Sequence, residues 1–175
     1  MRPGHYSGLS SIIQPTPSIP CIAGNLMVFE VILKDSRNNN ITASTSVRPD
    51  FFSIDISGLI TVNGVTFPAK FPGSVIQPDP SMPHLLLAQV QSNFEGEFTV
   101  SIMDSGDAVP SNLVGSPFTI VVNAAETNPS SCISSHPSVV IAGEDFNIVV
   151  QTFDVYNNPT DYESDDEFLG RIFQI

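Results

Sequence analysis

The chain has 175 residues, of which 41% are hydrophobic and only 14% are charged, and its formal net charge is −12. A field this negative repels nucleic-acid phosphates and anionic membrane surfaces, so we expect neither nucleic-acid binding nor direct membrane contact. No apolar run approaches the roughly 20 residues of a membrane span, and the first residues do not resemble a secretory signal peptide.

Short alternating segments bounded by Gly, Pro, Asn and Ser predict an all-β protein, and helical periodicity is absent. The first clear strand covers residues 26–34, where every second side chain is expected to face a core. These inward residues are Met27, Phe29, Val31 and Leu33. An aspartate and two asparagines then predict a turn at residues 35–39.

Two more strands are expected at residues 51–56 and 59–67, separated by Ser57 and Gly58. Asn63 and Gly64 offer an alternative, because this dipeptide is typical of the turn in a β-hairpin. The sequence leaves both interpretations open.

The segment 67–83 contains five prolines, which exclude a central strand. We therefore expect an inserted loop there. Alternation resumes over residues 84–91 and 98–102, and again over 117–122, which is expected to be the last strand of the unit.

One sequence pattern occurs twice, 119 positions apart, and seven of the twenty residues between positions 22 and 41 are identical at this offset. The identical residues of the first copy are Ile22, Ala23, Gly24, Val31, Asp35, Asn38 and Asn39. A repeat at a fixed period indicates tandem copies of one unit. At this offset Cys21 aligns with Val140, and Cys132 aligns with Ile13.

These observations predict a complete antiparallel β-sandwich of seven strands at residues 9–123. A polar linker at 124–131 and a truncated second copy at 132–175 are expected to follow. Tandem β-modules usually bind, space or adhere, so the repeat favours a binding role over catalysis.

Four motifs, in their order and spacing, resemble the filamin-type immunoglobulin-like repeat. They are Ala23-Gly24, the turn at 35–39, the segment 96–100 and Gly115-Ser116-Pro117-Phe118. The resemblance implies an immunoglobulin-like (filamin-type) antiparallel β-sandwich. Asn38 and Asn157 stand where that family has a turn glycine, and Phe98 stands where it has a tyrosine.

Within that family, the sparse charge, the cysteines and the asparagine-rich turns are similar to the ectodomains of plant gamete-expressed (sperm-cell) surface proteins. This resemblance implies an extracellular adhesion module on the plasma membrane that acts in gamete attachment. The alternative is a cytoplasmic, actin-crosslinking scaffold repeat. An accessory carbohydrate-binding domain is less favoured, because that role often uses exposed aromatic residues and the chain has no Trp.

We expect a protein partner, either on an opposing cell or in neighbouring repeats, and the sequence leaves the oligomeric state open. The inserted loop and an edge strand at 51–56 are the expected contacts, because loops on rigid scaffolds carry recognition. In the resemblance to cytoplasmic filamins, the strands near 50–56 and 59–66 correspond to the edge that accepts a peptide strand. The candidate residues are Phe51, Phe52, Ile54, Ile56, Pro72, Pro78 and Pro80. Core packing is the default alternative for the alternating apolar residues.

Asn40 begins the one N-glycosylation sequon, Asn40-Ile41-Thr42, whereas proline blocks the motifs at 128–130 and 158–160. Cys21 and Cys132 could form a disulfide, although two unbridged thiols are the favoured expectation.

No enzyme, metal or cofactor is expected. The three histidines, His5, His84 and His136, lack zinc-site spacing, and the acidic run at 161–167 lacks the glycine of a calcium loop. No nucleophile elbow or phosphate loop is found. The single carboxylates Asp55, Asp104 and Asp107 have no partner for acid–base chemistry.

Overall fold

The structure, a computed structural model, describes residues 7, 10–14, 21–42, 48–62, 64–106 and 110–161. The chain divides into two compact units, Met1–Asn123 and Ala124–Ile175. Residues 124–131, which were expected to form a linker, belong to the second unit. The other predicted domain boundaries stay predictions. Among the described residues, no helix has the length and apolar character needed to cross a membrane.

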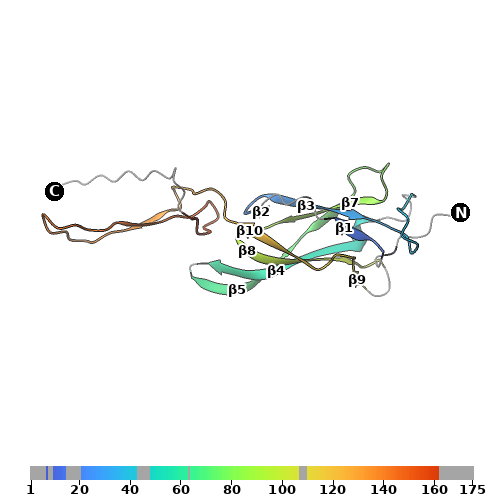
Figure 1. Ribbon diagram of the computed structural model, residues 1–175, viewed down its shortest axis with the longest axis horizontal. Coiled ribbons are helices and arrows are strands. Elements are labelled where there is room, and N and C mark those ends of the chain that lie inside the picture. Colours follow the sequence, from blue (N-terminus) through green and yellow to red (C-terminus); the bar gives the residue numbers. More distant parts are fainter. Residues whose placement is uncertain are drawn as a thin grey trace. The chain divides into compact units, whose positions relative to one another are not determined.

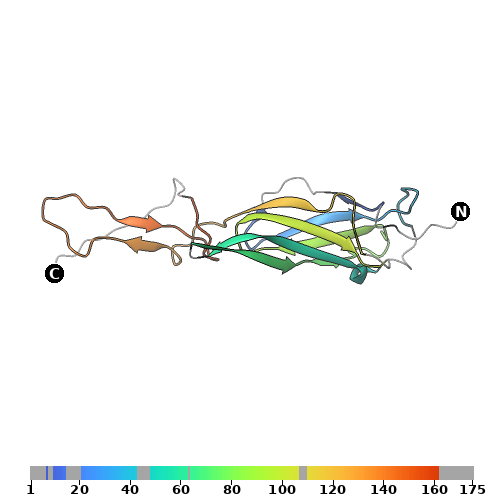
Figure 2. The ribbon, with the colours of Figure 1, turned by 90° about the horizontal axis from the view of Figure 1, so that it is seen from below.

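Two packed sheets form the first unit (Figures 1 and 2). The first sheet contains four strands in the order β1 (Ile12–Gln14), β3 (Leu26–Ile32), β7 (Leu85–Gln91) and β6 (Ser74–Ile76). The second sheet has the order β2 (Cys21–Ile22), β10 (Phe118–Asn123), β8 (Gly96–Asp104), β4 (Phe52–Val62) and β5 (Val65–Pro72), and β9 (Ser111–Asn112) pairs with β8.

The predicted antiparallel β-sandwich is confirmed, and β2 and β10 are the one parallel pair among the named strands. The expected number of seven strands is wrong, because the two sheets contain 4 + 6 = 10 strands in the described part. Three of the short segments, β1, β2 and β9, have only two or three residues each and carry little periodic signal.

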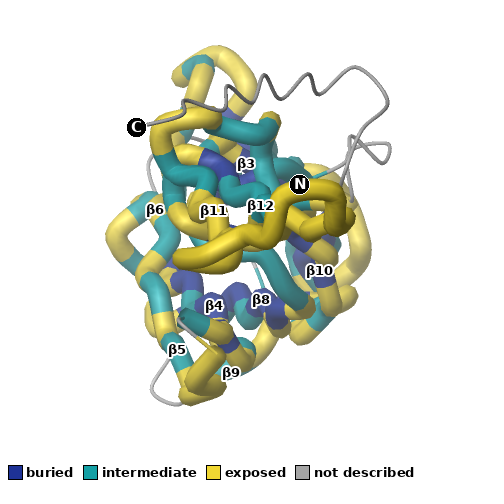
Figure 3. The backbone as a smooth tube through the Cα atoms, turned by 90° about the vertical axis from the view of Figure 1, so that its left-hand side faces the viewer, coloured by how far each residue is buried: buried dark blue, intermediate teal, exposed yellow. Residues whose placement is uncertain are grey.

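The core lies between the sheets, where Figure 3 shows buried residues along β3, β4, β8 and β10. As predicted, alternate residues of the strand at 26–34 face inward, and Val31 and Leu33 are fully buried. The same alternation buries Leu86, Ala88 and Val90 of β7. Burial of such side chains is the main stabilising contribution to the fold.

The prediction of a single inserted loop at 67–83 is wrong. β5 runs along the edge of the second sheet as far as Pro72, and β6 begins at Ser74 in the first sheet. Gly73 therefore carries the chain from one sheet to the other. Prolines are tolerated at a sheet edge, where the missing N–H faces away from the neighbouring strand.

β4 is continuous through Ser57 and Gly58, so the expected break at these residues is wrong. The alternative interpretation, a hairpin turn at Asn63 and Gly64, agrees with the structure: β4 ends at Val62, β5 begins at Val65, and Gly64 has a φ of 77°. Asn63 itself lies outside the described residues.

In the described part of the second unit, residues 124–161, the named strands form one antiparallel pair, β11 (Ile133–Ser135) with β12 (Val149–Gln151). Its hydrogen bonds repeat those of the first unit. Asp35 N donates to Asn39 O, and Asp154 N donates to Asn158 O. Asn38 and Asn157 have φ values of 67° and 66°, so both asparagines adopt the left-handed conformation that favours glycine.

The first strand of the repeat follows a different offset from the rest. Ile12 pairs with Ile32 and Ile133 pairs with Gln151, which gives offsets of 133 − 12 = 121 and 151 − 32 = 119. Cys132 consequently occupies the place of Ser11, not that of Ile13. Each side chain donates to the backbone carbonyl four residues before it: Ser11 Oγ donates to Ser7 O, and Cys132 Sγ donates to Asn128 O.

Candidate interaction surface

β8 pairs with one side of β4 from Phe52 to Gly58, whereas β5 pairs with the other side only from Asp55 onward. The prediction of a sheet edge at residues 51–56 is therefore wrong for Asp55 and Ile56, which lie between two strands, whereas no named strand pairs with residues 52–54 on the side away from β8. Phe52, Ile54 and Ile56 point into the sandwich and are buried. They pack in the core, which was the default alternative for these residues, and are not accessible to a partner.

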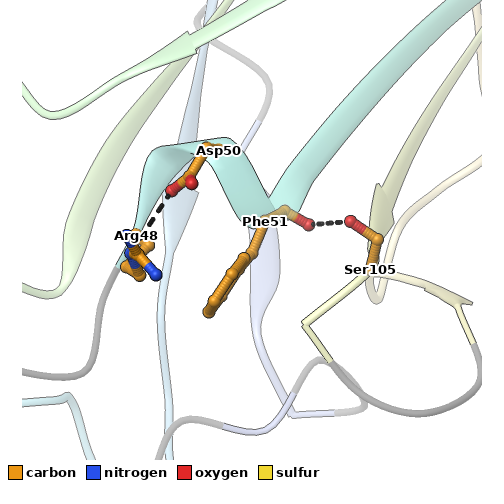
Figure 4. Close-up of polar contacts among 4 residues, drawn as sticks. All are labelled: Arg48, Asp50, Phe51 and Ser105. Carbon is orange, nitrogen blue, oxygen red and sulfur yellow. Dashed lines mark hydrogen bonds and ion pairs between the residues drawn. The ribbon is translucent and has the colours of Figure 1, made fainter.

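Phe51 precedes β4, in the short 3-10 turn η2 (Pro49–Phe51) shown in Figure 4. Ser105 N and Oγ both donate to Phe51 O, at 2.7 and 2.6 Å. The guanidinium carbon of Arg48 lies 5.3 Å from the centroid of the Phe51 ring, and Arg48 Nε lies 3.8 Å from Asp50 Oδ1. Phe51 is half-buried, its backbone carbonyl is hydrogen-bonded, and the Arg48 guanidinium lies over its ring. We therefore expect Phe51 to be a poor anchor for a partner.

Pro72, Pro78 and Pro80 are exposed, as a contact surface requires. Pro72 lies on the outer edge of β5, together with Pro68, four residues before it. Successive backbone N–H groups of a strand point to opposite sides, so those of residues 66, 68, 70 and 72 would all face the outer edge of β5. Proline has no N–H, so only Thr66 and Lys70 offer donors at this edge. This edge is therefore protected against the addition of another strand.

The hairpin formed by β4 and β5 is longer than the sheet that supports it. The last pair between β4 and β8 joins Gly58 to Phe98, whereas the pairing of β4 with β5 continues to Val62 and Val65. We call residues 59–62 and 64–68 the hairpin extension. Figure 1 shows it projecting beyond the ends of β8 and β10.

Large apolar side chains of the hairpin extension are exposed on both of its faces. Leu59 is 62% exposed, Val65 63% and Phe67 41%. Leu59 pairs with Pro68 on the outer face of the sheet, and Phe67 pairs with the buried Ile60 on the inner face. No residue between 59 and 68 is charged, although the chain carries a net charge of −12.

The base of the hairpin extension is closely packed. A Cβ on Gly58 would lie 2.6 Å from both Glu97 O and Phe98 Cδ1, so β4 and β8 approach each other more closely than a side chain permits. Phe71 stacks on Phe94 with centroids 5.8 Å apart. These contacts anchor the base of the extension to the sandwich, from which its apolar side chains extend into solvent.

Sequence reasoning placed the strand near 59–66 at a candidate edge, but it did not single out Leu59, Val65 and Phe67 as exposed residues. Their alternation resembles that of any half-buried strand, and the missing neighbour on the β8 side is a feature of the fold alone. A usable signal was the uncharged run from 59 to 68 around an Asn-Gly turn, because an exposed hairpin normally carries charges.

The duplicated turns differ in burial. Asp35 Oδ1 accepts from the backbone N–H of Arg37 and Asn39, each at 2.9 Å. Asp154 is fully buried, and its carboxylate accepts from Tyr156 N, Asn158 N and Asn158 Nδ2 and also from Ala125 N, 2.9 Å away. Asp154 thus ties the start of the second unit to its turn.

Acid should loosen this second turn. Burial raises the pKa of the Asp154 carboxyl, but hydrogen bonds from Asn158, Ala125 and Tyr156 together hold the pKa below its ordinary value. Since the folded pKa is the lower one, the stabilisation is present above the ordinary value of about 4 and is lost as pH falls through the folded pKa. An NMR titration of the Tyr156 amide should give a lower midpoint than a peptide of residues 150–160, and Asp154→Asn should abolish the transition. Equal midpoints would contradict this prediction.

The other candidate residues form no site within the described part of the chain. Cys21 and Cys132 lie in different units, are half-buried and form no disulfide in the described structure, and the expectation of two unbridged thiols stays a prediction. Burial raises the pKa of the Cys21 thiol. Within the described residues no three His, Cys, Asp or Glu side chains are grouped to hold a metal ion. His5, Asp107 and most of the acidic run at 161–167 lie outside the described residues.

Comparison with known proteins supports the fold. No protein-family model and no curated protein matches the chain. Among solved structures, it is similar to FdeC, an adhesin of Escherichia coli, with 20% identity and a TM-score of 0.51 over 91% of this chain. The fold is immunoglobulin-like, as predicted. The match covers 45% of the FdeC chain, so it spans less than half of that protein.

The filamin domain of Lin-41 is also similar, with 19% identity and a TM-score of 0.45, over 69% of this chain and 98% of that domain.

Proposed function

We propose that this chain is a non-enzymatic protein-interaction module with tandem immunoglobulin-like units, and that the hairpin extension contacts the partner. The observation that carries the proposal is the exposure of Leu59, Val65 and Phe67 on an uncharged strand pair. Apolar side chains grouped on a surface mark sites of protein interaction, and aromatic anchors contribute most of the binding energy at such sites.

The finer part of the proposal is adhesion outside the cell, with gamete attachment as its setting. The low content of charged residues supports it, as does the similarity in fold to an adhesin. The alternative, a cytoplasmic scaffold repeat that binds peptides by strand addition, has less support. β5 already pairs with β4 from Asp55 onward, and prolines protect the outer edge of β5.

Staining of cells with an antibody against this chain tests the location. Intact gametes of the organism that encodes the chain should stain without permeabilisation. The purified chain, added in excess, should reduce the number of attached gametes. Staining that appears only after permeabilisation contradicts the adhesion proposal and favours the scaffold.

Polar substitutions in the hairpin extension should weaken adhesion without unfolding the unit. Burial of one such side chain contributes about 1.5–3 kcal/mol, which corresponds to at least a tenfold change in affinity. We expect Phe67→Ser to reduce the binding of chain-coated beads to intact cells about tenfold, and Leu59→Ser with Val65→Ser to reduce it further.

A matched control is available at the other end of the unit. Val114 is similarly exposed, at 48%, and lies next to β1, where Ile13 N donates to Val114 O. Val114→Ser removes an exposed aliphatic group of the same kind and should leave bead binding unchanged. Equal losses for Val114→Ser and Phe67→Ser would show that the hairpin extension has no special role.

A further inference from the structure

Three successive asparagines in the first turn have three different roles. Asn38 adopts the left-handed backbone conformation, with a φ of 67°. The Asn39 amide nitrogen donates to both carboxylate oxygens of Asp35, at 3.3 and 3.2 Å. Asn40 is exposed, and its side chain makes no hydrogen bond to the described residues. The turn therefore uses the first two asparagines and leaves the third available.

Asn40 is also the residue that begins the sequon. Its neighbour Ile41 is 2% exposed and donates its N–H to Leu33 O at 3.2 Å, which anchors the middle of the tripeptide. Alternation then places the flanking residues outside, and Asn40 and Thr42 are both exposed. The two side chains that the modification chemistry requires thus face solvent.

The second turn shows that this arrangement is not a general property of the repeat. Asn158 occupies the place of Asn39, is 3% exposed, and donates through Nδ2 to Asp154 Oδ2 at 2.7 Å. The next residue is Pro159 in place of Asn40, so the second copy has no sequon. One of the two equivalent turns thus has an accessible acceptor, and the other has none.

We propose that Asn40 carries an N-linked oligosaccharide. The donor would be an oligosaccharide linked to a lipid pyrophosphate. A bond forms between Asn40 Nδ2 and the anomeric carbon of the first sugar, the bond from that carbon to the phosphate oxygen breaks, and the lipid pyrophosphate leaves with the electron pair. One amide proton is lost to a base. Because Ile41 is tied into the folded unit, transfer occurs before the unit has folded. The exposure of Asn40 then allows the folded unit to accommodate the attached glycan.

The position of Asn40 leaves the hairpin extension accessible. Asn40 lies beyond the Ile32 end of β3. At the other end of β3, Leu26 pairs with Gln91, and the chain continues from Gln91 to Gly96. A Cβ on Gly96 would lie 3.3 Å from Leu59 O, at the base of the hairpin extension. Figure 1 shows the turn and the hairpin extension at opposite ends of the first unit. A bulky, hydrated glycan at Asn40 would cover one end and leave the other open.

The test is peptide mapping of the protein isolated from its own cells. Release of the glycan by an amidase in ¹⁸O-labelled water should convert Asn40 to labelled Asp. An unlabelled Asn40 overturns the proposal. This inference rests on the proposed extracellular location, and the staining experiment separates the two: unmodified Asn40 on cells that stain intact defeats the glycan alone.

Variants secreted from eukaryotic cells behind an added signal peptide provide a second test. Asn40→Gln and Thr42→Ala should both lose the amidase-sensitive mass shift, and Thr42→Ser should retain it. Asn39→Gln, one residue away, leaves the sequon intact and should also retain the shift. A wild-type chain that is secreted without any mass shift overturns the proposal whatever the location of the native protein.

Discussion

Phe98→Ala should lower the free energy of unfolding of the first unit by about 3–5 kcal/mol. Phe98 is fully buried in the middle of the second sheet, and the Phe71 ring meets it edge-on with centroids 6.1 Å apart. Truncation removes these contacts and leaves a cavity between the sheets that the rigid strands cannot close. Because domains are typically stable by only 5–15 kcal/mol, the loss is a large part of the total.

Urea unfolding followed by far-ultraviolet circular dichroism measures this effect. Phe67→Ala is the matched control, because it makes the same truncation on a side chain that is 41% exposed. Exposed substitutions usually change stability by no more than about 0.5 kcal/mol. Similar losses for the two variants would contradict the position of Phe98 in the core and that of Phe67 on the surface.

The sequence predicted the fold where local pattern and burial coincide. Met27, Phe29 and Val31 recur at every second position, and a period of two leaves only one face to bury. The turn at 35–39 was equally predictable, since an aspartate that binds backbone N–H groups and an asparagine that tolerates positive φ specify it locally.

Strand order could not be predicted in the same way. Phe52, Ile54 and Ile56 alternate as they would in an edge strand or in an interior strand, and only the non-local pairing with β5 and β8 distinguishes the two. The prolines of the segment 67–83 led to the opposite error. They exclude a central strand, but they permit an edge strand, which is where Pro68 and Pro72 lie.

The candidate site was predicted only in part. Pro72, Pro78 and Pro80 are exposed as expected, whereas the hairpin extension depends on β4 being longer than its pairing with β8. The repeat shows the same limit. The offset of 119 was read from residues 22–41 and holds there, but the preceding strand follows an offset of 121. The segment that joins this first strand to the rest of the repeat is therefore two residues shorter in the second copy. Because the two copies share no sequence identity there at either offset, the sequence gives no sign of this difference.

Gly73→Val should destabilise the first unit by about 1–3 kcal/mol or more, because it overpacks the point where the chain changes sheets. Gly73 N donates to Ile54 O in β4, and a Cβ on Gly73 would lie 2.8 Å from Gln89 O in β7 and 2.9 Å from Ile54 Cβ. Backbone from one sheet and a branched core side chain from the other thus leave no room for a side chain. Valine must push β7 and β4 apart, and β6 should lose its pairing with β7.

Ser74→Val is the matched control, because it places the same side chain one residue further along, at an exposed position of a strand. Valine is favoured in strands, so the stability of this variant should stay within about 0.5 kcal/mol of the parent. Hydrogen exchange distinguishes the two variants locally. In Gly73→Val the amides of β6 and their partners in β7, such as Leu87 opposite Ile76, should exchange faster, whereas those of β8 should be less affected. Unchanged exchange in β6 would show that the close approach at Gly73 does not position the two sheets relative to each other, and that another contact fixes the point where the chain passes from β5 to β6.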